Sequence, residues 1–156
     1  MGEVINVEGK QYVVFLLGKE NYGVDIQKVT TIEKIMPFAR VPKTPDYIKG
    51  VINLRGEIVP VMDLRIKFGM EYREETEETR VIIIKINDIS LGIIVDEVDE
   101  VLNLSEESIE NITNFTNDLS MDYILGVGKV DGRIVTLLNI DKIAEVSENT
   151  KQGEIL

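Results

Sequence analysis

Short apolar runs rich in valine and isoleucine recur along the chain, and glycine, asparagine and aspartate separate them. Runs of this length and composition are typical of β-strands, whereas helices need longer patterns with a period of 3.6 residues. Pairs such as Arg55-Gly56, Asn87-Asp88 and Asp131-Gly132, and the triplet Asn21-Tyr22-Gly23, predict the turns. We expect strands over Tyr12–Leu17, Val51–Leu54, Ile58–Met62, Val81–Ile86, Leu91–Val95 and Ile134–Leu138.

Helical patterns are short. Ile26, Val29, Ile32 and Ile35 recur every three residues, which favours a helix that covers the core with this face while a few of these side chains stay exposed. We expect short helices at Ile26–Ile35, Pro45–Lys49, Leu64–Phe68, Ser105–Glu110 and Asp141–Val146.

An internal repeat organises the chain. Tyr47–Val51 resembles Tyr123–Val127, and the same spacing of 76 residues relates Gly56 to Gly132. The repeat predicts two similar all-β lobes at about 11–66 and 80–146, with elements that can be exchanged between them. Each lobe is expected to close its strands into a small barrel, because closure removes exposed strand edges. The lobes form a single domain over 1–156, with 147–156 as a flexible tail.

Two acidic segments stand out. The stretch Lys67–Arg80 carries five glutamates and predicts an exposed connector, with partner docking as the open alternative. Asp96-Glu97 and Asp99-Glu100 could serve a hydrolase or a hard metal ion. However, their alternation with valines predicts that they lie on a solvated face.

Composition removes several classes of function. The formal net charge of −11 disfavours binding to nucleic acid or anionic membranes. The chain has no cysteine and no histidine, so thiolate sites, the commonest general base and the commonest zinc ligand are missing. The glycines at Gly18 and Gly126–Gly128 do not have the spacing of phosphate-binding loops. We therefore predict no catalytic residue, no metal site and no cofactor, in a soluble cytoplasmic protein.

An interaction surface is the remaining hypothesis. Arg55 lies in a tight turn between two apolar strands, where its guanidinium can bind carboxylates in a fork. The matching turn of the second half has Asp131 instead, which leaves room for a role in one lobe only. Phe115 lies in a polar loop, where it either packs back on its lobe or contacts a partner.

The segments Gly50–Gly56, Ile58–Arg65 and Tyr123–Gly126 resemble the hallmark of CheW-like coupling proteins of bacterial chemotaxis, and the likeness extends from about Gln11 to Val146. The resemblance implies a mainly β fold of two intertwined SH3-like five-stranded barrels with a few short helices. It also implies a non-enzymatic adaptor that couples methyl-accepting chemoreceptors to the histidine kinase CheA. The alternatives are a CheW-like module derived from a CheA or CheV-type protein, and an enzyme that uses the acidic cluster.

The same resemblance implies the partners and their contact residues. The partners are the cytoplasmic tip of the receptors, the regulatory domain of CheA and other CheW-like proteins in rings, which recruit the protein to membrane receptor arrays. Contacts to the kinase or to a coupling protein would involve Glu110, Asn114 and Phe115. Contacts to the receptor would involve Val29, Ile32, Gly50, Asn53, Arg55, Gly56 and Val101.

One position departs from the family pattern. Many relatives place a glutamate just before the isoleucine of the first helix, where it can face the turn arginine. This chain has Thr30 and Thr31 there, and Glu33 follows Ile32. The sequence therefore does not predict an ion pair between Arg55 and a glutamate.

Overall fold

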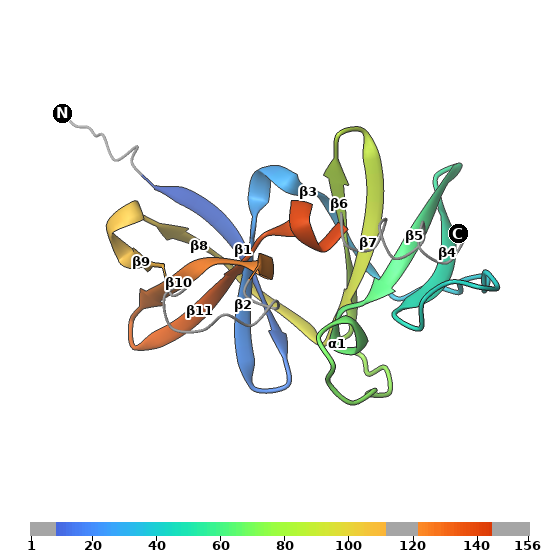
Figure 1. The fold of residues 1–156 in the computed structure, drawn as a ribbon, viewed down its shortest axis with the longest axis horizontal. Coiled ribbons are helices and arrows are strands. Elements are labelled where there is room, and N and C mark those ends of the chain that lie inside the picture. Colours follow the sequence, from blue (N-terminus) through green and yellow to red (C-terminus); the bar gives the residue numbers. More distant parts are fainter. Residues whose placement is uncertain (1–8, 112–121, 145–156) are drawn as a thin grey trace.

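Two β-sheets joined side by side make up the molecule (Figure 1). The computed structural model describes residues 9–111 and 122–144. The five-stranded lobe has the strand order β3-β6-β7-β5-β4, and the six-stranded lobe has the order β8-β1-β2-β11-β10-β9. The strands are β1 (Lys10–Leu17), β2 (Glu20–Asp25), β3 (Val29–Lys34), β4 (Ile48–Leu54), β5 (Glu57–Asp63), β6 (Arg80–Ile86), β7 (Ile89–Val95), β8 (Glu97–Leu104), β9 (Ile109–Glu110), β10 (Ile124–Val130) and β11 (Arg133–Leu138).

Every predicted strand is present, extended by one to three residues at one or both ends. Three hairpins turn on the predicted pairs Arg55-Gly56, Asn87-Asp88 and Asp131-Gly132, in which both residues have positive φ. Such turns match the right-handed twist of the strands that they join. The predicted turn at Asn21–Gly23 is wrong, because these residues lie inside β2 and the β1–β2 turn is at Gly18-Lys19.

The repeat is visible in the strand pairing. In the five-stranded lobe β5 runs parallel to β7, with Val61 opposite Gly92. In the six-stranded lobe β11 runs parallel to β2, with Leu137 opposite Gly23 at the matching positions. Each sheet therefore takes one hairpin from each half of the chain, so the two repeats are intertwined. The predicted boundaries at 11–66 and 80–146 describe the two repeats of the sequence and not the two sheets.

Each sheet curls round on itself. In each lobe the chain that follows one edge strand, β3 or β8, pairs with a strand at the opposite side of the sheet, β4 or β10. After β3 the chain pairs with β4 through two backbone hydrogen bonds between Ala39 and Val51, of 2.9 and 2.8 Å. After β8 the chain pairs with β10 in the same way, with Glu110 of β9 opposite Val127. Both lobes thus become small barrels that leave few strand edges exposed.

Three apolar clusters fill the molecule. On β1, Val13, Phe15 and Leu17 face a central cluster that contains residues of both sheets. Tyr12 and Val14 point to the opposite side, into the interior of the six-stranded lobe. Strand β6 repeats this arrangement, since its alternate residues face the central cluster and the interior of the five-stranded lobe. Burial on both faces explains why these strands are continuously apolar.

Of the five predicted helices, one is absent and two are reduced to a single 3-10 turn. Over Ile26–Ile35 the chain forms a short 3-10 helix, η1 (Ile26–Lys28), and then β3, whose backbone pairs with β6 and whose valine, threonine and isoleucine residues favour a strand. Pro45–Lys49 is a turn followed by the start of β4, and Ser105–Glu110 forms the 3-10 helix η2 (Glu106–Ser108) and then β9.

Two helix predictions are supported. The helix α1 (Leu64–Lys67) begins where Asp63 accepts hydrogen bonds from the backbone N–H groups of Arg65 and Ile66. A last helix begins at Ile140 and is helical through residue 144, where the described part of this segment ends. The predicted tail, 147–156, lies outside the described residues.

Aromatic rings line the junction between the lobes. Phe15, Tyr22, Phe68 and Tyr123 form a chain of neighbours with ring centroids 5.8 to 6.0 Å apart. The ammonium group of Lys67 lies 4.1 Å from the ring centroid of Tyr47 and 5.6 Å from that of Tyr123. The two tyrosines of the repeat thus contact the same cation, which joins the halves at their equivalent positions.

Burial of Tyr22 makes the stability of the fold depend on pH in the alkaline range. Desolvation, together with a hydrogen bond to Glu20 and its charge, raises the pKa of Tyr22 from 10.0 to about 12. The folded state therefore retains a proton that the unfolded chain loses. The contribution of Tyr22 to the free energy of unfolding is fully present below pH 10 and falls as the pH rises towards 12. We expect Tyr22→Phe to reduce this fall in urea unfolding series at increasing pH. An equal fall in the parent and the variant would contradict this prediction.

Candidate interaction site

The β4–β5 turn presents Arg55 to solvent. The side chain of Asn53 accepts a hydrogen bond of 2.9 Å from the backbone N–H of Gly56 and so holds the turn. Arg55 has a φ of 53° and a side chain that is 72% exposed. Because the turn is fixed, the side chain of Arg55 begins at a defined point outside the barrel, and its guanidinium stays available to a partner.

Arg55 does pair with a glutamate, contrary to the expectation from the sequence. Its Nη2 lies 3.5 Å from Oε2 of Glu33, which also accepts a hydrogen bond of 3.0 Å from the hydroxyl of Thr31. The Glu33 side chain is only 19% exposed. The pair forms because residues 29–34 are a strand, in which Thr31 and Glu33 share one side. In the helix that the sequence predicts, Thr31 and Glu33 would not share a side, so the sequence did not indicate this pair.

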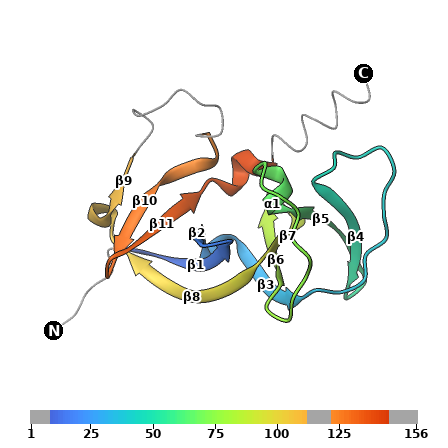
Figure 2. The same ribbon diagram turned by 90° about the horizontal axis from the view of Figure 1, so that it is seen from below.

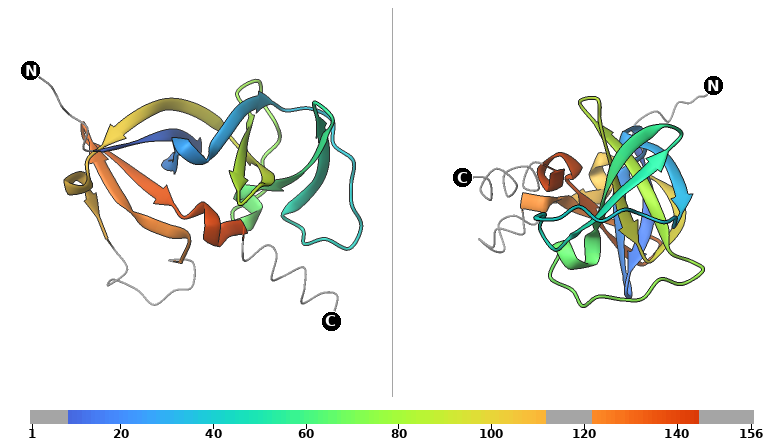
Figure 3. Two further views of the ribbon diagram at one scale, coloured as in Figure 1. Left: turned by 90° about the horizontal axis from the view of Figure 1, so that it is seen from above. Right: turned by 90° about the vertical axis from the view of Figure 1, so that its right-hand side faces the viewer.

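Two of the predicted receptor residues are apolar and exposed. Ile32 of β3 is 39% exposed and Val101 of β8 is 47% exposed. They are equivalent in the repeat, since Ile32 lies opposite Ile82 of β6 and Val101 lies opposite Val13 of β1. Figures 2 and 3 show β3 and β8 on the same face of the molecule. Val29 is half-buried and packs against the central cluster.

Gly50 lies beneath the surface. It is buried, has a φ of +151°, and its position leaves no room for a side chain, because a Cβ would lie 2.2 Å from the carbonyl oxygen of Ala39. This glycine allows the close contact between the chain after β3 and β4 that closes the barrel. The structure thus places Asn53, Arg55 and Gly56 together at the turn, Ile32 and Val101 on the β3–β8 face, and Gly50 in a supporting position.

The residues predicted to contact the kinase are described only in part. Glu110 is exposed on β9, where its backbone pairs with Val127. Asn114 and Phe115 lie outside the described residues.

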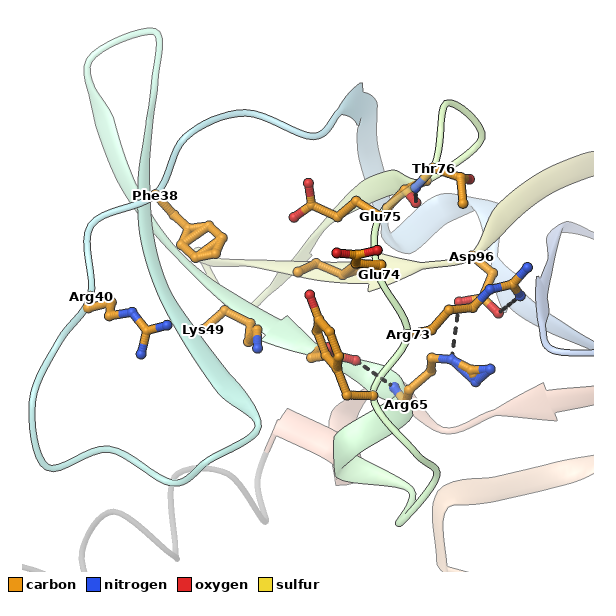
Figure 4. Close-up of a pocket in the computed structure, with 13 residues that line it drawn as sticks. Phe38, Arg40, Lys49, Arg65, Arg73, Glu74, Glu75, Thr76 and Asp96 are labelled. Atoms are coloured by element: carbon orange, nitrogen blue, oxygen red, sulfur yellow. Dashed lines mark hydrogen bonds and ion pairs between the residues drawn. The ribbon is translucent and has the colours of Figure 1, made fainter.

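The acidic connector is exposed over residues 71–78, as predicted. It passes beside the five-stranded lobe and forms one wall of a pocket of about 120 Å³, whose other walls carry Phe38, Arg40 and Lys49 (Figure 4). The ammonium group of Lys49 lies 4.9 Å from the ring centroid of the exposed Tyr72.

The second acidic cluster is not simply solvated. Asp99 and Glu100 of β8 both bind the guanidinium of Arg133 on β11, and Arg133 also donates a hydrogen bond of 2.9 Å to Asn21. The hydrogen bonds to Glu100 and Asp99 raise the pKa of Arg133 above its ordinary value. Asp96 is largely buried and pairs with two arginines. The described residues contain no group of three or more acidic, histidine or cysteine side chains placed to hold a metal ion.

Two closed barrels that present an exposed arginine turn and exposed apolar side chains define a β-barrel module of the kind that binds other proteins. A family model described as the CheW-like domain matches residues 11–148. The chain therefore belongs to the CheW-like family, and its role is that of an adaptor in chemotaxis signalling.

Individual relatives agree with this assignment. The chain is 40% identical over 140 residues to a chemotaxis protein CheW of Klebsiella aerogenes, covering 90% of this chain and 84% of that protein. It is 35% identical to a chemotaxis protein CheW of Bacillus subtilis, with 88% of both covered. A crystal structure of the scaffolding protein TtCheW from Thermoanaerobacter tengcongensis superimposes with a TM-score of 0.79 at 36% identity, over 88% of this chain and 89% of that one. These comparisons do not favour the CheV-type alternative, and they confirm the predicted fold class.

Proposed function

We propose that this protein holds the cytoplasmic tip of methyl-accepting chemoreceptors beside the regulatory domain of the histidine kinase CheA, without catalysing a reaction itself. Membership of the CheW-like family supports this proposal. The observation that carries it is the exposed Arg55 in the β4–β5 turn. Its guanidinium pairs with Glu33 of β3, the strand that also bears the exposed Ile32.

The geometry suits a receptor contact. A guanidinium offers a planar fork of donors to a carboxylate or to backbone carbonyls, and it is more weakly hydrated than an ammonium group, so it loses less hydration on binding than a lysine would. Because Glu33 is only 19% exposed and holds Arg55 from one side, it reduces the freedom that the arginine would lose on binding. Ile32 and Val101 supply the apolar contacts that stabilise such an interface.

The remaining contacts are proposed from the family. Glu110, Asn114 and Phe115 would contact the kinase or another CheW-like protein, and rings of such proteins would recruit the chain to membrane receptor arrays from the cytoplasm. Among the described residues, no helix has the length and apolar character to cross a membrane.

Charge reversal at the turn tests the receptor site. We expect Arg55→Asp to weaken binding of a receptor tip fragment about 10- to 100-fold, about 1.4 to 2.7 kcal/mol, because it replaces the donor fork with a repelling carboxylate. Binding of the isolated CheA regulatory domain should be unchanged. Isothermal titration calorimetry on the full chain measures both, with circular dichroism as the check of folding.

The other lobe offers a matched control. Asp131 occupies the equivalent turn, also with positive φ, so Asp131→Arg changes the charge by two units, in the opposite direction, at a site not assigned to the receptor. Unchanged receptor affinity is expected for this variant. If folded Arg55→Asp binds the receptor fragment as tightly as the parent protein, the assigned site is wrong.

A further inference from the structure

Asp96 lies where the chain passes from one lobe to the other. It directly follows β7 of the five-stranded lobe and directly precedes β8 of the six-stranded lobe. Its side chain is only 13% exposed, although the sequence pattern placed it on a solvated face. A carboxylate that is withdrawn from water in this way must be compensated by charges and donors around it.

The compensating groups come from three separate segments, and Figure 4 shows the two that carry arginines, Arg65 and Arg73. Oδ2 accepts a hydrogen bond of 2.7 Å from the backbone N–H of Gly18, in the β1–β2 turn of the six-stranded lobe. Nη1 of Arg73 in the acidic connector donates a hydrogen bond of 3.0 Å to the same oxygen. Oδ1 lies 3.4 Å from Nε of Arg65, which belongs to α1 directly after β5 of the five-stranded lobe.

The backbone adds a fourth connection. The N–H of Asp96 donates a hydrogen bond of 3.1 Å to the carbonyl oxygen of Leu16 on β1. One residue therefore binds the six-stranded lobe through Leu16 and Gly18, and the five-stranded lobe through Arg65. Removing its charge would leave the side chain of Arg65, which is 15% exposed, without its anionic partner.

This connection differs in kind from the central apolar cluster. Apolar packing holds the lobes together, but it is not directional, so it permits small rotations of one lobe on the other. Hydrogen bonds require defined distances and angles, and an ion pair weakens as its charges separate, so together they oppose such rotations. At the other crossing between the lobes the repeat-equivalent residue is Gln27, which is exposed. Its neighbour Lys28 forms an ion pair of 3.1 Å with Asp141, but both side chains are exposed, so what distinguishes the β7–β8 crossing is that its carboxylate is withdrawn from water.

We infer that Asp96 is a positioning residue that fixes the angle between the two lobes. Ile32 is carried by the five-stranded lobe and Val101 by the six-stranded lobe, so this angle sets how the two side chains are presented together. The consequence for receptor binding rests on the proposed function, whereas the consequence for the angle does not.

The absence of cysteine allows the angle to be measured directly. Lys85→Cys on β6 and Lys129→Cys on β10 place one exposed spin label on each lobe. In Asp96→Asn an acceptor for the Gly18 N–H remains and the charge is lost. We expect electron–electron double resonance to show a broader distance distribution for this variant than for the labelled parent, and titration to show receptor-fragment affinity reduced about fivefold or more.

Asp99→Asn is the matched control, since it removes an equally charged group whose partner, Arg133, lies in the same lobe. Its distance distribution should equal that of the parent. If Asp96→Asn does not fold, Arg73→Gln removes one of the same contacts from a half-exposed side chain and should give the same broadening.

The outcomes separate this inference from the proposed function. Superimposable distributions for the folded variant and the parent would overturn the inference. A broadened distribution with unchanged receptor affinity, when Arg55→Asp does weaken binding, would support the role in the angle and refute its consequence for receptor binding. A broadened distribution when Arg55→Asp has no effect would instead support the role in the angle and refute the receptor site.

Discussion

Gly50→Ala is expected to lower the free energy of unfolding by about 3 kcal/mol or more, since backbone strain and overpacking each cost about 1–3 kcal/mol. The new Cβ would lie 2.2 Å from the carbonyl oxygen of Ala39, and the φ of +151° is one that side chains rarely allow. Relief would require Ala39 to move away from β4, which would break the two hydrogen bonds with Val51 that close the barrel. Urea unfolding followed by circular dichroism measures the change.

Gly56→Ala separates the two causes. Gly56 also has a positive φ, of +90°, but no atom lies within 4 Å of the position of its Cβ. This variant should therefore lose only the conformational part, about 1–2 kcal/mol. Equal losses in the two variants would show that the contact with Ala39 is not what makes Gly50 necessary.

Phe15→Ala is expected to cost about 3–5 kcal/mol and to destabilise both lobes in a single transition. Phe15 belongs to β1 of the six-stranded lobe, yet its fully buried ring faces the central cluster that both sheets share. It also stacks on Tyr22, with ring centroids 5.8 Å apart. Hydrogen exchange at Val135 and at Ile52, one amide in each lobe, should therefore accelerate to the same extent.

The adjacent residue provides the control. Val14 is also fully buried, but it faces the interior of the six-stranded lobe alone. Val14→Ala should cost about 2 kcal/mol, for two methyl groups and the small cavity that they leave. Two separate unfolding transitions in the Phe15→Ala variant would show that the lobes are independent units and that the central cluster does not couple them.

The arginine turn could be found from the sequence, but its partner could not. Arg55-Gly56 between two apolar runs identifies a two-residue hairpin loop, whose geometry depends only on local backbone preferences. Glu33 was missed because Ile26–Ile35 combines a three-residue spacing of isoleucine and valine with strand-forming side chains. Pairing with β6, about fifty residues further on, decided between a helix and a strand, and no local pattern contains that information.

Asp96 shows the same limit. In the sequence it is one of four neighbouring acidic residues, and alternation with valines predicts the same solvated position for all of them. The structure separates it from the others because the crossing between the lobes brings Gly18, Arg65 and Arg73 to its carboxylate. Gly18 lies 78 residues and Arg73 lies 23 residues away along the chain, and the separation of Arg65 falls between these two.

The sequence by itself determined the all-β character, three of the hairpin turns, the duplication and the family, because each depends on local patterns or on a motif that can be compared directly. Only the tertiary structure decided which hairpin joins which sheet, that residues 29–34 form a strand, and which charges are paired. The physical reason is that parallel pairing, barrel closure and ion pairs join residues far apart in the chain, and their free energies depend on distances that only the folded chain defines.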